Sequence, residues 1–351
     1  MLENKEETKE ESKRSLCGML KRKKPTEASD YKRKQHSRRK RYRLRHPQRL
    51  CAVLLLILLL GGLGAGNLIL TGWQQSPELS FTTEQLAPLD FGQLHSANGI
   101  VIEADSGAVL GEKHSKDKIY PASLTKLMTA VVLLEHCDNL EDTVTFSPQW
   151  FHELYLQEAS MAGFAPRETV QLRDLLYGML LPSGAECCVA AADYVAGSEE
   201  AFVTLMNEKA EAVGMANTHF ANTTGLHAEN HYSTVEDMAR LLQYALHNDT
   251  FRSAFTSTQY HTTPSTQHPT GFTMQSTMFQ SLKDTRVTDG EIVGGKTGYT
   301  KEAGLCLASM ARIHGNEYIA VTAKADGNHQ TAPFHIQDAI TLYNQLGAAD
   351  V

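Results

Sequence analysis

The sequence is poor in cysteine and tryptophan, with 6 and 2 residues among 351, and aromatic side chains make up only 7% of it. So little cysteine in so long a chain excludes a small disulfide-stapled fold. No C-x-x-C pair and no internal repeat occur, and the 25 glycines follow no collagen-like period. A hydrophobic content of 42% also excludes wholesale disorder. The composition therefore indicates a globular protein with one large domain or two smaller ones.

The net charge of −7 conceals two segments of opposite charge. Residues 1–49 contain 18 Lys and Arg against 7 Asp and Glu, a net of +11, whereas the rest of the chain contains 15 against 33, a net of −18. The basic segment has almost no apolar periodicity, so we predict a disordered tail. Polybasic patches can bind nucleic acid, but the segment that follows favours a role at a membrane, and we expect no nucleic-acid partner.

Residues 50–71 form an apolar run of 22 residues without a charge. As a helix rising about 1.5 Å per residue, this run can cross a hydrocarbon core of roughly 30 Å. Because the basic cluster precedes it and the next cation is Lys113, the positive-inside rule places residues 1–49 in the cytoplasm. We therefore predict a transmembrane helix, an extracytoplasmic linker over residues 72–97 and a folded domain over residues 98–351. A cleaved signal peptide is the alternative.

The domain is predicted to begin with a β-hairpin and to end with strands and a helix. Gly99–Ala104 and Ala108–Glu112 are predicted strands, joined by residue types that favour a tight turn. Gly304–Ile313 and Glu317–Ala323 are further predicted strands, and a closing helix follows over Ile336–Leu346. The segment between is mostly helical, so we expect an α/β fold with an antiparallel sheet, flanking helices and a helical subdomain.

One predicted helix, over Ala185–Ala196, contains two adjacent cysteines, Cys187 and Cys188. A disulfide between neighbouring residues is geometrically strained, so both are predicted to be small buried hydrophobic residues.

Ser123 and Lys126 lie three residues apart at the start of a predicted buried helix. Its apolar residues recur at helical spacing: Leu124, Leu127, Met128, Val131 and Val132. Residues three apart share one face, so the Lys126 amine can reach the Ser123 hydroxyl as a base, and the helix N-terminus favours developing negative charge. The plain alternative is that Ser123 only caps this helix.

The pattern S-x-x-K is weak evidence by itself, because it occurs four times in the chain. The other three begin at Ser29, Ser37 and Ser115. Two of these lie in the basic tail, and Ser115 lies in a charged stretch with no apolar helix directly behind it. The context therefore selects Ser123.

Two further motifs follow in the same order along the chain. Ser183 lies in a predicted turn after a helical stripe of leucines, where an ordinary turn serine is the alternative. Lys296, Thr297 and Gly298 lie at a predicted strand edge, where an ammonium and a hydroxyl can meet a carboxylate and glycine permits close approach. Each tripeptide is weak alone, but the three in this order are a strong signal.

A zinc peptidase is the competing enzyme hypothesis, because His227 and His231 are four residues apart. Gly225 and Asn230 make a helix unfavourable there, so we predict exposed loop histidines and no metal site. The remaining histidines show no ligand spacing and are predicted to lie on the surface, among them His114, His152 and His261.

With S-x-x-K, the serine turn and K-T-G in place, the chain resembles the penicillin-binding proteins and serine β-lactamases. It is most similar to the low-molecular-weight D-alanyl-D-alanine carboxypeptidases, over roughly residues 98–346. The resemblance implies a penicillin-binding-type α/β fold, no cofactor, a peptidoglycan stem peptide as substrate and β-lactam antibiotics as covalent inhibitors. The domain would then act outside a bacterial cell, tethered to the membrane by the N-terminal helix.

The resemblance also assigns roles to residues of this sequence. Ser123 is the expected nucleophile, Lys126 its base, and Ser183 the group that passes a proton to the leaving D-alanine. Lys296 and Thr297, in the motif that ends at Gly298, are expected to hold the terminal carboxylate of the substrate. The backbone N–H groups of Ser123 and Tyr299 are the expected oxyanion hole.

The second motif departs from the family pattern Ser-x-Asn, because it reads Ser183-Gly184-Ala185 here. An alanine cannot support the base lysine or the substrate amide as asparagine does. A poorly active penicillin-binding scaffold at the cell wall is therefore one alternative. A β-lactamase is a second alternative, although neither Glu229 nor Glu236 lies in a context that resembles its Glu-bearing loop.

Overall fold

The computed structural model describes residues 89–349. The predicted tail, the predicted transmembrane helix and most of the predicted linker lie outside the described residues. Between residues 89 and 349, no helix is both long enough and apolar enough to cross a bilayer.

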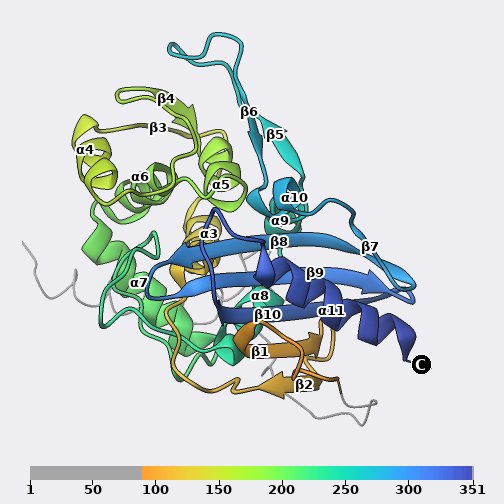
Figure 1. Cartoon of the computed structure of the whole chain (residues 1–351). Helices are drawn as coiled ribbons and strands as arrows, with labels where there is room; N and C mark the ends of the chain where they lie inside the picture. The colour runs from red at the N-terminus through yellow and green to blue at the C-terminus, as the bar shows by residue number, and fades with distance from the viewer. Residues whose placement is uncertain (1–88, 350–351) are drawn as a thin grey trace, which may run out of the picture. The chain divides into compact units, whose positions relative to one another are not determined.

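A six-stranded sheet in which every neighbouring pair is antiparallel forms the centre of the domain (Figure 1). In spatial order its strands are β2 (Val109–Lys113), β1 (Ser96–Glu103), β10 (Asn316–Ala325), β9 (Gly304–Ile313), β8 (Gly290–Thr300) and β7 (Arg286–Val287). The N-terminal hairpin thus pairs with the last strand of the chain, which confirms the predicted antiparallel sheet.

The turn between β9 and β10 shows why these strands form a hairpin. His314 and Gly315 have φ values of 50° and 85°, and two consecutive positive φ angles are typical of the turns that match the twist of paired strands. Most residues of both strands are buried, because helices cover both faces of the sheet.

One face of the sheet is covered by α11 (Phe334–Ala348). Figure 1 shows this helix running across β9 and β10. Leu342 and Tyr343 are fully buried there, and the Tyr343 hydroxyl lies 3.0 Å from the hydroxyl of Ser309 on β9. The predicted closing helix is confirmed, with a few more residues at each end.

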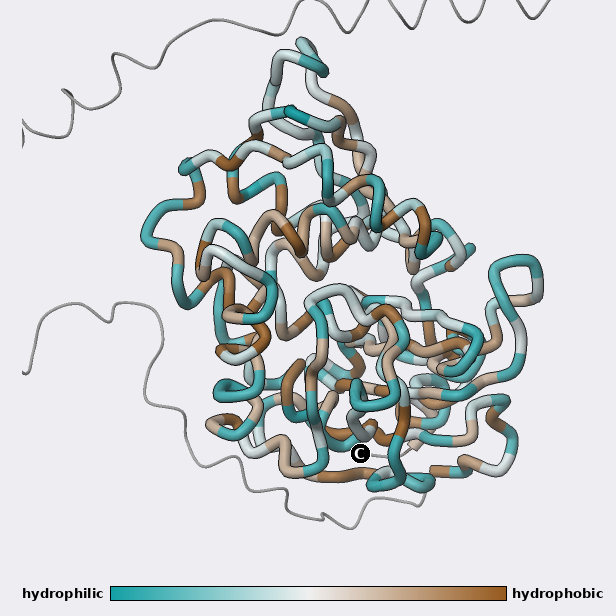
Figure 2. Tube along the Cα trace, turned by 90° about the vertical axis from the view of Figure 1, so that its left-hand side faces the viewer, coloured by the Kyte–Doolittle hydropathy of each residue, from teal (hydrophilic) through white to brown (hydrophobic). Residues whose placement is uncertain are grey.

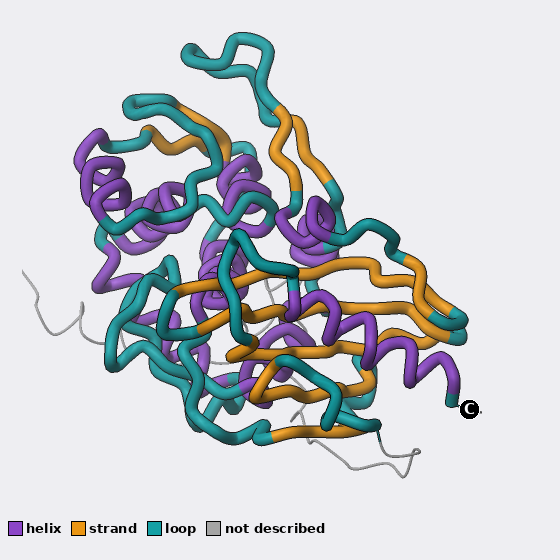
Figure 3. Tube along the Cα trace, in the orientation of Figure 1, coloured by secondary structure: helices purple, strands orange, loops and turns teal. Residues whose placement is uncertain are grey.

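The opposite face carries α8 (Val235–Leu246) and the mainly helical subdomain (Figure 3). As predicted, these helices lie in the chain between the N-terminal hairpin and the last strands of the sheet. The other helices on this side are α3 (Lys126–His136), α4 (Pro148–Leu156), α5 (Leu172–Leu180), α6 (Ala185–Ala196), α7 (Glu199–Ala212) and α9 (Asp249–Phe255). Helix α6 has the predicted bounds, and Cys187 and Cys188 on it are buried, unpaired thiols, as expected.

Two small ribbons complete the domain. One pairs β3 (Thr143–Thr145) with β4 (Thr169–Gln171), and the other pairs β5 (Gln259–His261) with β6 (Thr273–Gln275). The second ribbon projects from the top of the domain, and the loop at its tip is mostly hydrophilic in Figure 2. Its return strand leads directly into the short helix α10 (Thr277–Ser281).

The domain begins earlier than the predicted boundary at residue 98. Phe91 and Leu94 are buried against the sheet and α11, and β1 already starts at Ser96. The Asp90 backbone N–H also donates to the side-chain oxygen of Gln345. Residues 72–97 are largely polar and contain two prolines, so their composition resembles a linker although the end of the stretch packs onto the domain.

Candidate active site

Ser123 lies in a short 3-10 turn, η1 (Ala122–Thr125), directly before α3. The Lys126 Nζ donates a hydrogen bond of 3.0 Å to the Ser123 Oγ, so the predicted pair meets. Ser123 makes no side-chain cap for this helix. The plain capping alternative is therefore wrong.

Two glycines from distant segments allow η1 to pack closely against its neighbours. A Cβ on Gly225 would lie only 1.8 Å from the carbonyl oxygen of Ala122. A Cβ on Gly298 in β8 would lie 3.1 Å from the Ser123 backbone nitrogen. Real Cβ atoms essentially never come as close as 1.8 Å to backbone, so Gly225 is needed for its loop to reach η1, whereas a Cβ on Gly298 would fit only if η1 moved by a few tenths of an ångström.

Lys126 is buried, with 2% of its surface exposed, and its Nζ also donates to the carbonyl oxygen of Thr224 at 2.6 Å. Burial lowers the pKa of this amine, because the charged form loses its hydration. A neutral amine within hydrogen-bond distance of a hydroxyl can accept its proton.

A second lysine–serine pair faces the first. The Lys296 Nζ donates to the Ser183 Oγ at 2.9 Å and to the carbonyl oxygen of Thr297 at 2.7 Å. Lys296 is fully buried, and burial together with the nearby Lys126 holds its pKa well below the ordinary value. Ser183 has a φ of 68°, a left-handed conformation that is uncommon outside glycine and is often found at functional sites.

The three predicted motifs converge on one cleft of about 290 Å³. It is lined by Ser123, Ser160, Ser183, Thr277, Ser281, Thr297, Gly298, Tyr299, Leu305, Asn328, His329, Thr331, Pro333 and His335. A second cavity of about 470 Å³ is lined by Ser123 and Lys126, and it shares Ser160 and Tyr299 with the first. Ser123 thus borders two cavities.

The side chain of Ala185 cannot make a hydrogen bond to the Lys126 amine, and other groups make the polar contacts in this part of the site. The Lys126 amine has the carbonyl oxygen of Thr224 as its second partner. The next residue, Glu186, is buried and accepts hydrogen bonds from the backbone N–H groups of Ala162 and Gly163, at 2.7 and 3.2 Å. Glu186 therefore holds the loop that brings Ser160 to the cleft.

The rejected S-x-x-K serine lies apart from this cleft. Ser115 is buried and donates to the carboxylate of Glu112 at 2.6 Å, which is a structural contact. Ser29 and Ser37 lie outside the described residues.

The two histidines of the zinc hypothesis have separate environments. His227 packs edge-on against the ring of Tyr120. His231 is buried, with 2% exposed, so its predicted exposure is wrong. Its Nε2 contacts the Thr125 hydroxyl at 2.7 Å, and its Nδ1 accepts from the backbone N–H of Ala221 at 3.1 Å. Burial lowers its pKa to about 4. The ring is therefore a neutral structural link that supports the residue before Lys126.

His114, His152 and His261 are exposed as expected, but His335 is not. With Ser160, Thr277 and Ser281, it is a cleft residue that sequence analysis missed. None of these residues belongs to a recognisable motif. They reach the cleft because segments far apart in the chain fold side by side.

Comparison with known proteins assigns this arrangement to a family. The family model described as D-alanyl-D-alanine carboxypeptidase matches residues 81–327. D-alanyl-D-alanine carboxypeptidase DacF of Bacillus subtilis is 35% identical over 232 residues, which cover 64% of this chain and 56% of that protein. DacC of Escherichia coli is 35% identical over 196 residues, covering 54% and 48%. The chain thus spans about half the length of these curated relatives.

Among solved structures, the Streptomyces K15 DD-transpeptidase superposes with a TM-score of 0.64 at 27% identity, covering 72% of this chain and 97% of that one. This likeness agrees with the observed sheet, subdomain and cleft. The chain therefore belongs to the D-alanyl-D-alanine carboxypeptidase family.

Proposed function

We propose that this protein is a serine-type D-alanyl-D-alanine carboxypeptidase, which removes the terminal D-alanine from peptidoglycan stem pentapeptides. One observation carries the proposal: the Ser123 hydroxyl lies 3.0 Å from a buried lysine amine in a cleft shared with a second lysine–serine pair. The family assignment supports the same substrate class.

In this proposal the reaction proceeds through an ester on Ser123. The Ser123 Oγ attacks the carbonyl carbon of the penultimate D-alanine while its proton passes to the neutral Lys126 amine. The peptide bond then breaks, and the leaving amine of D-alanine takes up a proton through Ser183. The backbone N–H groups of Ser123 and Tyr299 stabilise the oxyanion, an effect of about 3–4 kcal/mol per donor. Water finally hydrolyses the ester and restores the serine hydroxyl.

The same chemistry makes β-lactams inhibitors in this proposal. Ser123 opens the strained lactam ring and forms an acyl-enzyme. The nitrogen released from the ring stays attached to the acyl group, so no leaving group departs from the cleft. The scaffold and β-lactamase alternatives are less favoured, since the serine–lysine contact is intact despite Ala185 and the relatives are named as carboxypeptidases.

The test is covalent labelling of the full chain with a fluorescent penicillin. Ser123→Ala is expected to abolish labelling, whereas Ser115→Ala, which alters the other S-x-x-K serine of the domain, leaves it intact. Labelling of the Ser123→Ala protein would contradict the site. Steady-state release of D-alanine from a D-Ala-D-Ala peptide, beside turnover of penicillin, separates carboxypeptidase, scaffold and β-lactamase.

We also propose that the segment at residues 50–71 anchors the protein in the bacterial cell membrane as a single span, with the catalytic domain outside. The support is the uncharged run of 22 residues and the basic cluster before it. Membrane fractionation tests this: the full chain is expected with the membrane, and a chain that lacks residues 1–71 in the soluble fraction. A soluble full chain, or a mature N-terminus beyond residue 71, would contradict the anchor.

A further inference from the structure

The Lys126 amine depends on a backbone carbonyl for its orientation. A neutral amine has two N–H groups and one lone pair, and it accepts the Ser123 proton only when the lone pair faces the serine. The amine nitrogen lies 2.6 Å from the carbonyl oxygen of Thr224 and 3.0 Å from the Ser123 Oγ. An N–H donated to the carbonyl leaves the lone pair free to face the serine. Because the four-carbon stem of a lysine is flexible, the Thr224 carbonyl sets this arrangement.

The Thr224 carbonyl is in turn oriented by the side chain of Asn222. This carbonyl and the N–H of Gly225 belong to one planar peptide unit, in which they point in opposite directions. The Asn222 Oδ1 accepts that N–H at 2.7 Å, and with its second lone pair it accepts the backbone N–H of Thr224 at 3.2 Å. The Asn222 Nδ2 donates to the carbonyl oxygen of Leu226 at 2.8 Å. Because Asn222 fixes the N–H side of the peptide plane, the carbonyl on the other side points at Lys126.

Other contacts hold the beginning of this loop independently of Asn222. The Thr223 N–H and hydroxyl both donate to the Glu199 carboxylate on α7, at 2.9 and 2.7 Å. The Thr129 hydroxyl on α3 donates to the carbonyl oxygen of Thr223 at 2.7 Å. Removal of the Asn222 side chain would therefore free the Thr224–Gly225 peptide while Thr223 stays attached to both helices.

Asn222 acts on the base from outside the catalytic cleft. Among the described residues, it lines neither of the two cavities that Ser123 borders, so its side chain does not meet the reacting atoms. Ala185, by contrast, lines one of these cavities together with Lys126. The position where the family pattern has an asparagine thus leaves open space beside the base, and no side-chain amide supports the amine from there.

We propose that Asn222 is a positioning residue that, through the Thr224–Gly225 peptide, orients the Lys126 amine toward the nucleophile. It thereby gives the base the support that Ala185 cannot give. The support of the base moves in this way from the second motif to a loop beyond α7. The proposal rests on the proposed function, because it concerns the acylation of the serine.

The rate of acylation by penicillin, measured by stopped flow over a range of pH, tests the proposal in the full chain. Asn222→Ala is expected to lower the rate on the alkaline plateau about 10- to 100-fold, as misplacements of up to about 1 Å do. The hydrogen bond to the Thr224 carbonyl favours the charged amine, so its loss should also move the midpoint of the pH profile to lower pH. Asn222→Asp keeps the acceptor for both N–H groups and should retain most of the plateau rate.

A double-mutant cycle with Ala185→Asn separates this role from a general loosening of the fold. The cavity that Ala185 and Lys126 share has room for the added amide, which can support the amine directly. In the Ala185→Asn background, Asn222→Ala should lower the plateau rate less than about threefold. An equal loss in both backgrounds would overturn the proposal, because the two positions would then act independently.

Asn207→Ala is the matched control. The Asn207 side chain also bonds to backbone, with its Oδ1 2.8 Å from the Phe220 nitrogen and its Nδ2 2.9 Å from the Phe220 carbonyl oxygen, but these contacts do not involve the peptide beside Lys126. This variant should leave the plateau rate and the midpoint unchanged. Equal effects of Asn207→Ala and Asn222→Ala, or an unchanged midpoint in Asn222→Ala, would overturn the role of Asn222. An unmutated chain that penicillin does not acylate would instead overturn the proposed function, so the two failures are distinguishable.

Discussion

Gly225 controls the position of η1, and so of Ser123, although it carries no side chain. Its φ is 83°, and the Ala122 carbonyl lies where a Cβ would be. Gly225→Ala is expected to push η1 away from Thr224, whose carbonyl holds the Lys126 amine. We expect the rate of penicillin acylation to fall by the order of 100-fold, as misplacements of about 1 Å do. Stopped-flow acylation measures this effect.

Gly197 provides the matched control for that substitution. Its φ is 74°, but no atom lies within 4 Å of the Cβ that alanine would add. Gly197→Ala should therefore cost only the roughly 1–2 kcal/mol of a left-handed alanine and leave acylation unchanged. Equal acylation rates in the two variants would contradict the role of Gly225.

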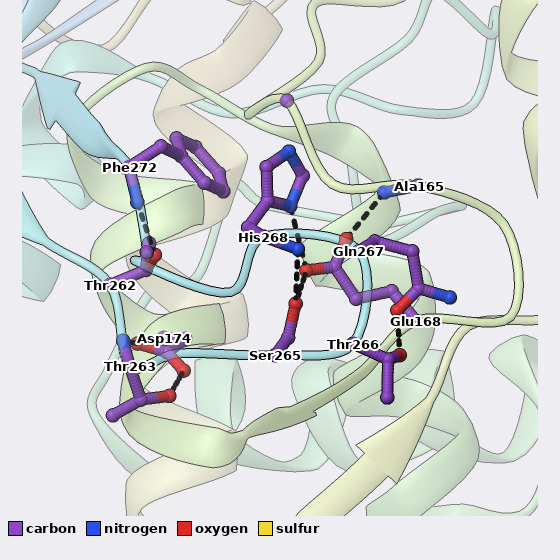
Figure 4. A network of polar contacts seen from close by, with 12 residues as sticks. Ala165, Glu168, Asp174, Thr262, Thr263, Ser265, Thr266, Gln267, His268 and Phe272 are labelled. Atoms are coloured by element: carbon purple, nitrogen blue, oxygen red, sulfur yellow. Dashed lines mark hydrogen bonds and ion pairs between the residues drawn. The ribbon is translucent and has the colours of Figure 1, made fainter.

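At the scale of elements, the β5–β6 ribbon is tied to the helical subdomain by two buried carboxylates (Figure 4). Glu168 accepts from the backbone N–H of Ala165 at 2.7 Å, from the His268 ring at 2.8 Å and from the hydroxyl of Ser265. The second carboxylate, Asp174, accepts from the Tyr260 hydroxyl at 3.0 Å and from the N–H and hydroxyl of Thr263. Because β6 leads directly into α10, these contacts also help to place Thr277 in the cleft.

Asp174→Ala is expected to loosen the ribbon without unfolding the sheet. It leaves the donors of Tyr260 and Thr263 without their acceptor, at a cost of about 1–3 kcal/mol for each donor that stays buried. Hydrogen exchange should accelerate over residues 259–275 and stay slow in α11. The control is Asp193→Ala, at an exposed position on α6. Unchanged exchange in the ribbon, or equal acceleration in α11, would contradict this role.

At the scale of the whole molecule, the burial of His231 leads us to expect that the free energy of unfolding decreases in acid. Its pKa is about 4 in the folded protein, because burial disfavours the cation, and 6.5 is the ordinary value. Between these values the unfolded chain binds more protons, so the free energy of unfolding decreases as the pH falls through this window. The full effect is about 3 kcal/mol. Protonation would also place an N–H on the His231 Nδ1, which could then no longer accept the hydrogen bond from the backbone N–H of Ala221.

Denaturant unfolding at pH 7 and at pH 4.5 checks this prediction. His231→Gln should be less stable than the unmutated chain at pH 7 and should lose less stability between the two pH values. His114→Gln, at an exposed position, is the control and should follow the unmutated chain. Parallel pH dependences for all three proteins would show that His231 does not carry the effect.

The parts that sequence analysis predicted are those that local rules encode. Ser123 and Lys126 are three residues apart, so a single helical turn brings them together whatever the rest of the chain does. The strands at β9 and β10 follow from their apolar content and from a turn rich in permissive residue types. The exposure of His231 was wrongly predicted, because a loop position gives no sign that Thr125 covers it.

The sequence by itself determined the contact between Ser123 and Lys126 and the two hairpins of the antiparallel sheet, since each depends on residues close in the chain. Only the tertiary structure decided which side chains from distant segments lie beside Ser123, Lys126 and Lys296. The Thr224 carbonyl reaches Lys126 across 98 positions, and Ser183 meets Lys296 across 113. His335 enters the cleft because α11 packs on β9 and β10. Such contacts follow from the burial of apolar faces, and that packing leaves no periodic signal at the polar residues it brings together.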